Sequence, residues 1–98
     1  MAYRLTWSPS ACHDLQELAS YISKSSPESA VKFIKKVFDT VEYIPDFPKS
    51  RPVVPEFENS NIREEIRKPC RIIFRIKPKK RTIEIVRIWH SAIGTPQI

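Results

Sequence analysis

The stretch "CRIIFRIK", residues 70–77, decides the fold because it combines the period of a β-strand with charge on one side only. Side chains two positions apart on a strand point to the same face of the sheet. One face therefore carries three apolar side chains: Ile72, Phe74 and Ile76. Because Arg71 and Arg75 fall on the other face, the stretch predicts a sheet with one packed face and one charged face.

The segments beside this stretch predict two further strands. "IREEIR" (62–67) alternates, and "RTIEIVRIWH" (81–90) is apolar enough for a central strand. "KP" at 68–69 and "PKK" at 78–80 are short enough to join the three strands as successive hairpins. The last strand has apolar residues on both parities, so either both its faces are buried or a β-bulge switches its parity.

The first of these two strands also bears on the charged face. We expect its Arg63 and Arg67 to lie on the same face as Arg71 and Arg75. Adjacent arginines repel one another, so such a row is expected either to be paired or to await an anionic partner. We expect Glu65 to neutralise part of the row.

The N-terminal half predicts one strand followed by two helices. "YRLTW" (3–7) alternates as a short strand. Apolar residues spaced four and three apart predict amphipathic helices over 9–24 and 27–44, and each helix begins at a Ser-Pro pair that supplies an N-cap and a first helical residue. Residues 45–61 contain four prolines and no periodicity, which predicts a loop.

This order of elements, β-α-α-β-β-β, predicts a single α+β domain over residues 1–98. Two helices joined by so few residues must fold back as a hairpin, and each has one apolar stripe to bury. We therefore expect an N-terminal helical hairpin packed on one face of a small, antiparallel-dominated sheet. The opposite face then lacks helical cover.

Charge is the most informative feature of the composition. The formal net charge is +6, but residues 1–60 hold seven Lys and Arg against eight Asp and Glu, whereas residues 61–98 hold ten against three. A basic surface confined to one half suggests an anionic partner, either nucleic acid or an acidic protein segment.

Other features narrow the class of protein. No apolar run approaches the length of a membrane-spanning helix, and the N-terminus lacks a signal-peptide pattern, so we expect a cytoplasmic protein without membrane contact. Cys12 and Cys70 lack the spacing of zinc ligands and are expected to be packing residues. We expect neither a metal nor a cofactor.

The motifs, taken in order, resemble a known family. The predicted helical hairpin is followed by "RPVVPE" (51–56), "IREEI" (62–66), "CRIIFRI" (70–76) and "IEIVRIWH" (83–90). This order and spacing resembles the RelE/ParE superfamily of toxins from type II toxin-antitoxin modules, whose members are also called plasmid stabilisation proteins. The likeness covers nearly the whole chain and is nearer the ParE-like branch.

The resemblance implies a toxin that inhibits growth when freed from a cognate antitoxin, with which it forms a hetero-oligomer. An acidic antitoxin segment folding over the toxin would complement the basic half of the chain. ParE-like members poison DNA gyrase without catalysis, whereas RelE-like members cleave messenger RNA in the ribosome without a metal. A non-toxic relative that only binds its antitoxin is a third alternative.

The resemblance also assigns three residues of a nuclease. Glu56 matches the position of the general base, Arg71 that of a phosphate-binding arginine, and His90 that of the general acid or its helper. Several nuclease members have a tyrosine after this histidine, but here Ser91 follows, and the tail "SAIGTPQI" contains no aromatic residue. The tail favours the gyrase-binding alternative, and the three matched residues favour the endonuclease.

Five arginines are expected to contact a partner or nucleic acid: Arg63, Arg67, Arg71, Arg75 and Arg87. The two on residues 70–77 have no packing role that the sequence suggests, because they lie on the non-helical face. Arg71 matches the family's phosphate-binding position. Arg75 matches no catalytic position and is expected to contact the antitoxin.

Overall fold

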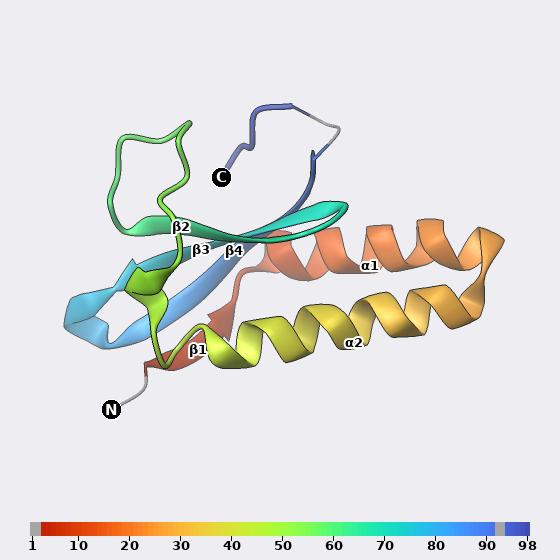
Figure 1. Cartoon of the computed structure of the whole chain (residues 1–98), viewed down its shortest axis with the longest axis horizontal. Helices are drawn as coiled ribbons and strands as arrows, with labels where there is room; N and C mark the ends of the chain where they lie inside the picture. Colours follow the sequence, from red (N-terminus) through yellow and green to blue (C-terminus); the bar gives the residue numbers. More distant parts are fainter. Residues whose placement is uncertain (1–2, 92–93) are drawn as a thin grey trace.

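The computed structural model describes residues 3–91 and 94–98, and its elements follow the predicted β-α-α-β-β-β order (Figure 1). They are β1 (Arg4–Trp7), α1 (Pro9–Ser25), α2 (Pro27–Tyr43), β2 (Ile62–Arg67), β3 (Cys70–Lys77) and β4 (Thr82–His90). Short 3₁₀ turns add η1 (Pro48–Ser50) and η2 (Pro78–Lys80). In the described part of the chain, no helix is long and apolar enough to cross a membrane.

Both helices begin at the predicted Ser-Pro pairs. Ser8 Oγ accepts a hydrogen bond from the Ala11 N–H at 3.0 Å, and Ser26 Oγ accepts one from the Ser29 N–H at 3.1 Å. These bonds satisfy N–H groups that a first helical turn leaves without partners. Ser26 also donates its backbone N–H to the Ile22 carbonyl at 3.0 Å. One residue thus ends α1 and begins α2, which forces the two helices into a tight hairpin.

The sheet has the strand order β1-β4-β3-β2. β1 pairs with β4 in parallel, while the β3–β4 and β2–β3 pairs are antiparallel, so the predicted antiparallel-dominated sheet is confirmed. Both helices lie along one face of this sheet (Figure 1). This arrangement makes β3 and β4 central and leaves β1 and β2 at the edges.

The face beneath the helices holds the main core, and the apolar side of β3 forms its centre as predicted. Ile72 and Phe74 are fully buried, and Ile76 is 1% exposed. Other core members come from the helices and β4: Ala11, Val37, Val41, Ile44, Ile83, Ile85 and Ile88. Because burial of one large apolar side chain contributes roughly 1.5–3 kcal/mol, this layer is the main source of stability.

β4 carries a β-bulge at Val86. Ile73 pairs with Arg87 and Phe74 pairs with Ile85, so Val86 has no direct partner on β3. The bulge switches the parity of β4, and both faces of the strand contain buried residues. Both alternatives considered for this strand therefore hold.

Irregular chain replaces helical cover on the other side of the sheet, which we call the outer face. The loop before β2 and the C-terminal segment lie over it (Figure 1). A second, smaller core forms there from Val54, Ile62, Ile73, Val86 and Trp89, with Phe57 packed against it. The tail is held down because the Trp89 Nε1–H donates to the Gly94 carbonyl at 3.1 Å and Pro96 is fully buried.

The register of β2 corrects one expectation. A two-residue turn pairs Arg67 with Cys70, and Arg63 therefore pairs with Phe74. Directly opposed residues share a face, and both partners belong to the core beneath the helices. Arg63 and Arg67 thus lie on the helix side, and the prediction that they line up with Arg71 is wrong.

Candidate functional site

Arg71 on β3 is the centre of an ion-pair cluster on the outer face. Its Nη1 and Nη2 donate to the two carboxylate oxygens of Glu56 at 2.9 and 2.8 Å, and its Nε donates to Glu64 Oε1 at 2.6 Å. The side chains of Arg71, Glu64 and Glu56 are 14%, 8% and 28% exposed. A fork of two parallel N–H···O bonds is the strongest geometry for an arginine and a carboxylate. The guanidinium therefore has carboxylates on both of its donor edges.

This cluster shifts the protonation equilibria of its members. The hydrogen bonds from Arg71 lower the pKa of Glu56 below its ordinary value. The hydrogen bond with Glu56, followed by that with Glu64, raises the pKa of Arg71. A carboxylate whose pKa is lowered by a paired cation is a weaker proton acceptor at neutral pH. Proton abstraction by Glu56 requires this ion pair to open.

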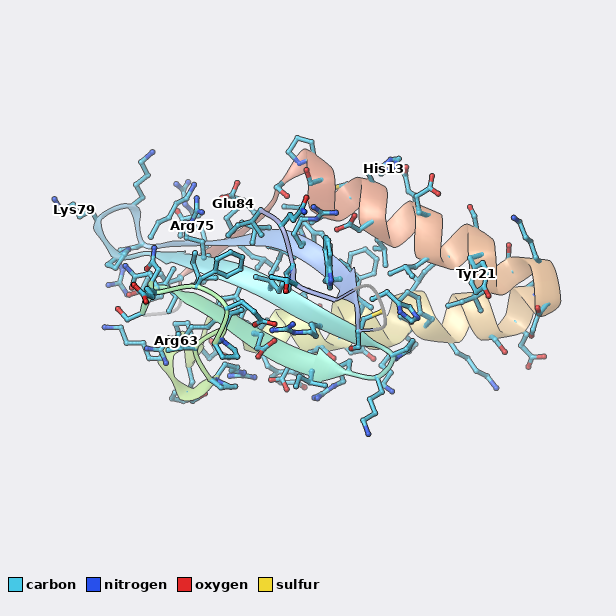
Figure 2. All side chains as sticks on the ribbon, turned by 90° about the horizontal axis from the view of Figure 1, so that it is seen from above. His13, Tyr21, Arg63, Arg75, Lys79 and Glu84 are labelled. Carbon is cyan, nitrogen blue, oxygen red and sulfur yellow. The ribbon has the colours of Figure 1, made fainter. Side chains whose placement is uncertain are left out.

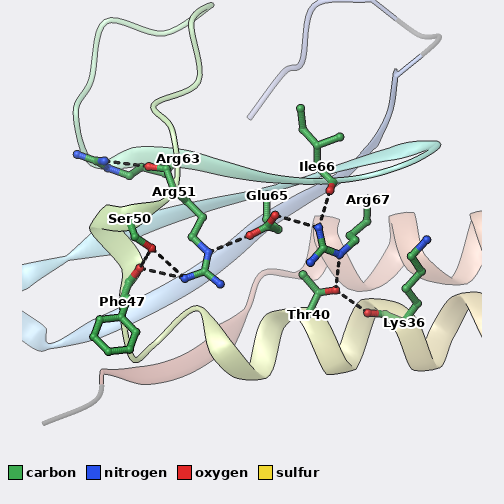
Figure 3. A network of polar contacts seen from close by, with 9 residues as sticks. All are labelled: Lys36, Thr40, Phe47, Ser50, Arg51, Arg63, Glu65, Ile66 and Arg67. Atoms are coloured by element: carbon green, nitrogen blue, oxygen red, sulfur yellow. Dashed lines mark hydrogen bonds and ion pairs between the residues drawn. The ribbon is translucent and has the colours of Figure 1, made fainter.

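Glu64 is a member of this cluster that the sequence reasoning missed. It lies opposite Ile73, which places it on the outer face with 6% exposure. The expectation that Glu65 neutralises part of the arginine row is confirmed for Arg67, which donates to it at 3.0 Å (Figure 3). Glu65 lies on the helix side of the sheet, where it also accepts from Arg51 at 2.9 Å, so it is not part of the Arg71 cluster. The two-residue turn after β2 was the signal for this parity.

Arg63 and Arg67 bind to the chain itself, as Figure 3 shows for a network between β2 and α2. The Arg67 Nε–H donates to Thr40 Oγ1 at 3.2 Å, and the Thr40 hydroxyl donates to the Lys36 carbonyl at 2.7 Å. Arg63 Nη1 donates to the Arg51 carbonyl at 2.9 Å. These bonds tie the edge strand to the second helix and to the loop before it.

Arg87 on β4 is held by Asp14 of α1, a second residue that the sequence reasoning missed. Its Nε and Nη2 donate to the two Asp14 oxygens at 2.7 and 2.8 Å, which raises the pKa of Arg87. Its Nη1 donates to the Gln97 carbonyl at 2.8 Å, and its guanidinium lies 4.7 Å from the Trp89 ring centre. Asp14 also accepts from the Ile88 N–H at 3.0 Å. Arg87 therefore joins the first helix, the sheet and the tail.

Arg75 lies four residues beyond Arg71 on β3 and points to the same outer face. Within residues 3–91 and 94–98, no hydrogen bond or ion pair engages its side chain. Its neighbours across the strands are Ile62 and Glu84. The Glu84 carboxylate pairs with Lys77 instead, at 3.3 Å.

His90 ends β4 and lies opposite Cys70, whose side chain belongs to the core beneath the helices. The register therefore directs His90 to the helix side, where it lines a pocket of about 200 Å³ shared with α1. Trp89, opposite Arg71, belongs to the outer face. The structure thus brings Glu56 and Arg71 together but assigns His90 to the other side of the sheet.

The two cysteines differ in environment. Cys70 is fully buried as a packing residue, and burial raises the pKa of its thiol to about 11. Cys12 is exposed on α1, so its prediction as a packing residue is wrong. Among the residues that the structure describes, no group of three or more His, Cys, Asp or Glu is placed to hold a metal ion.

The helical hairpin on a four-stranded mixed sheet is the fold seen in solved toxin-antitoxin systems. The chain superposes with a TM-score of 0.72 on a chain of the chromosomal ParDE TA system from P. aeruginosa, at 24% identity over 91% of this chain and 96% of that one. The TM-score is 0.62 for a chain of the toxin-antitoxin complex RelBE2 from Mycobacterium tuberculosis, at 19% identity over 92% and 99% of the two chains.

The sequence itself gives the family. Residues 5–93 match the family described as "ParE toxin of type II toxin-antitoxin system, parDE", and the chain belongs to that family. The chain is also 27% identical over 96 residues to the protein named "Putative toxin Y4kP" of Sinorhizobium fredii strain NBRC 101917 / NGR234. This alignment covers 97% of this chain and 95% of that protein. The predicted membership of the RelE/ParE superfamily is confirmed.

Proposed function

We propose that this ParE-family toxin inhibits growth by binding DNA gyrase, without chemistry of its own, when it is released from a cognate antitoxin. The observation that carries the choice of mechanism is the closure of Arg71 on Glu56 and Glu64. A scissile phosphate at Arg71 has to displace Glu56, the residue that a nuclease needs as its base. An arginine that is already paired with two carboxylates is better suited to a structural role in the sheet than to RNA cleavage.

The position of His90 is a second argument for a binding toxin. A general acid has to come within hydrogen-bond distance of the leaving oxygen at the same phosphate that the base and the cation hold. The pairing of His90 with Cys70 puts it on the side of the sheet away from Arg71. A shared reaction centre therefore needs a rearrangement at the end of β4.

A RelE-like messenger RNA endonuclease that works in the ribosome is the second candidate function. It is favoured by the direct contact of Glu56 and Arg71, because two of the three nuclease positions already lie within hydrogen-bond distance. In this alternative the substrate phosphate replaces Glu56 on the arginine and frees the carboxylate to act as a base. Catalytic hydrogen bonds often form only in the substrate complex.

Induced expression in bacteria separates the two mechanisms. The variants are His90→Ala and Glu56→Gln, and the control is His13→Ala, which alters the other histidine, an exposed residue of α1. A gyrase-binding toxin is expected to stop growth with signs of DNA damage in all three variants and the wild type. Purified gyrase should then lose supercoiling activity when the wild-type chain is added.

Two results would contradict the gyrase proposal. One is an immediate stop in protein synthesis that His90→Ala relieves, because removal of a general acid costs about 10²- to 10⁴-fold in cleavage rate. The other is tight antitoxin binding by a wild-type chain that does not affect growth. The first result identifies the endonuclease, and the second identifies a non-toxic relative.

The groove between α2 and β2 is suited to the proposed antitoxin. It is open, encloses about 350 Å³, and is lined by Lys32, Lys35, Lys36, Asp39, Thr40, Tyr43 and Arg67. Within this groove the ring of Tyr43 is 65% exposed. Cations beside an exposed aromatic ring match an acidic segment with an apolar anchor. Charge reversal in Lys32→Glu/Lys35→Glu is expected to weaken rescue by the co-expressed antitoxin.

A further inference from the structure

The turn that joins β3 to β4 concentrates positive charge at one end of the molecule. Residues 75–84 contain five Lys and Arg and a single carboxylate, that of Glu84. Figure 2 shows Lys79 extending past the end of the sheet, while Tyr21 on the helical hairpin lies at the far end of the long axis. Residues 78–81 are all exposed. We call residues 75–81 the hairpin tip.

Several cations of the hairpin tip lack the carboxylate partners that the sheet arginines Arg71 and Arg87 have in the described structure. On α2, Lys35 pairs with Asp39 at 2.7 Å. For Lys79, Lys80 and Arg75, the part of the chain that the structure describes provides no ion pair. Like charges held this close repel one another and lower the stability of the fold. A cluster that costs stability is expected to have a partner that neutralises it.

The hairpin tip also lacks the apolar anchors of a protein interface. The exposed large apolar side chains of the described residues lie on the helices, in the loop, at the edge of β2 and in the tail: Tyr21, Val31, Phe38, Tyr43, Phe47, Val53, Ile66 and Ile98. None of them belongs to residues 75–81. Protein interfaces depend on buried aromatic and apolar anchors, whereas binding to a nucleic-acid backbone needs only cations and polar groups.

The shape of the hairpin tip selects among nucleic acids. Single strands are bound by stacking of bases on exposed aromatic rings, and the ring beside the tip, Tyr3, is packed against the main core and covered by Arg81 at 4.8 Å. The tip is the end of the β3–β4 hairpin. β1 pairs with β4 as far as Thr82, so the sheet reaches the tip and only the turn of residues 78–81 projects beyond it. A short exposed turn can reach the phosphates along the major groove of B-form DNA, which is about 12 Å wide, whereas the major groove of A-form RNA is narrow.

Two details of the turn fit this role. Arg81 has φ +47°, in the left-handed region, and this lets the chain reverse directly after η2 so that Lys79 and Lys80 stand at the apex. Beside them is an open hollow of about 420 Å³, lined by Asn61 and residues 77–80. The side-chain amide of Asn61 and the backbone N–H groups that line this hollow add hydrogen-bond donors for phosphate oxygens.

We propose that the hairpin tip binds the phosphate backbone of double-stranded, B-form DNA, with Lys79 and Lys80 as the principal contacts and Arg75 beside them. This contact is independent of base sequence, because the cations bind phosphate oxygens and not base edges. It goes beyond the proposed growth inhibition and does not depend on which target the toxin has.

Fluorescence anisotropy with a labelled duplex of about 20 bp tests the proposal, using the full chain between about 50 and 200 mM KCl. The variant is Lys79→Gln/Lys80→Gln. The matched control is Lys24→Gln/Lys49→Gln, at two exposed positions away from the tip, because both double variants reduce the formal net charge from +6 to +4. We expect the slope of log K against log [KCl] to fall by about two in the tip variant and to stay unchanged in the control.

Three results would overturn the proposal. The first is the absence of salt-dependent binding to the duplex by the wild-type chain. The second is an equal loss of slope in both double variants, which would assign the binding to net charge alone. The third is tighter binding to a single-stranded or double-stranded RNA of the same length, which would make RNA the partner.

Discussion

The two ends of β3 carry the same residue type on the same face and use it differently. At one end Arg71 is 14% exposed and has Glu56 and Glu64 within hydrogen-bond distance. At the other end Arg75 has Glu84 across the strand, but that carboxylate pairs with Lys77. The carboxylates that other elements bring to each arginine make the difference.

This comparison shows why a count of basic residues does not locate the basic surface. Arg71 forms ion pairs with carboxylates of the loop and β2, and Arg87 forms one with a carboxylate of α1. Arg63 and Arg67 lie on the helix side and bind to nearby carbonyl and carboxylate groups. The positive field of the sheet therefore arises at the hairpin tip, where carboxylates are scarce.

Replacement of Arg71 is expected to have the largest effect and to break the comparison most directly. Arg71→Ala should lower the free energy of unfolding by about 3 kcal/mol, because it leaves the buried carboxylate of Glu64 without a cation. Arg75→Ala, on the same face, should change it by less than about 0.5 kcal/mol. Urea unfolding followed by circular dichroism measures both, and equal losses would show that the two ends do not differ.

The alternation of "CRIIFRIK" and the two Ser-Pro starts were sufficient to predict the elements and the packed face of β3. Both signals are local, because a strand's parity and a helix's first turn depend on residues close in sequence. The face of Arg63 and Arg67 on β2 was predicted wrongly, although the two-residue turn pairs Arg67 with Cys70 and so fixes the parity. The error came from grouping arginines by charge instead of by the turn.

The partners of the arginines could not be predicted from the same signals. Asp14 reaches Arg87 across 73 positions of the sequence, and Glu56 reaches Arg71 from an aperiodic loop. Such contacts depend on how the loop and the first helix pack on the sheet. The resemblance did associate Glu56 with Arg71, but no pattern of residues indicated that the two would neutralise each other.

Removal of Glu56 should have a smaller effect that depends on pH. Glu56→Gln is expected to cost about 1 kcal/mol at pH 7, because the carboxylate is partly exposed to solvent and its ion pair is screened. The lowered pKa of Glu56 means that its contribution is complete above its unfolded value of about 4.3 and is lost as the pH falls through the folded value.

Urea unfolding of wild type and Glu56→Gln between about pH 7 and pH 3 tests this dependence. The two stabilities should converge once the pH falls below the folded pKa of Glu56, which is lower than its ordinary value. Glu58→Gln, two residues along the same loop at an exposed position, is the control and should match the wild type at neutral pH. A difference between wild type and Glu56→Gln that persists unchanged in acid would mean that packing, not charge, accounts for the loss.

The smallest effect is expected at the hairpin tip, and its sign and salt dependence sharpen the comparison. Lys79→Gln/Lys80→Gln should raise the free energy of unfolding by less than about 0.5 kcal/mol at low salt, because it relieves repulsion among exposed cations. At about 1 M salt the Debye length is about 3 Å, so this gain should disappear. The deficit of Arg71→Ala should persist there, since buried charges are screened much less. If salt removed both differences alike, the Arg71 cluster would be an ordinary surface ion pair, and the two ends of β3 would differ only in how many carboxylates lie near them.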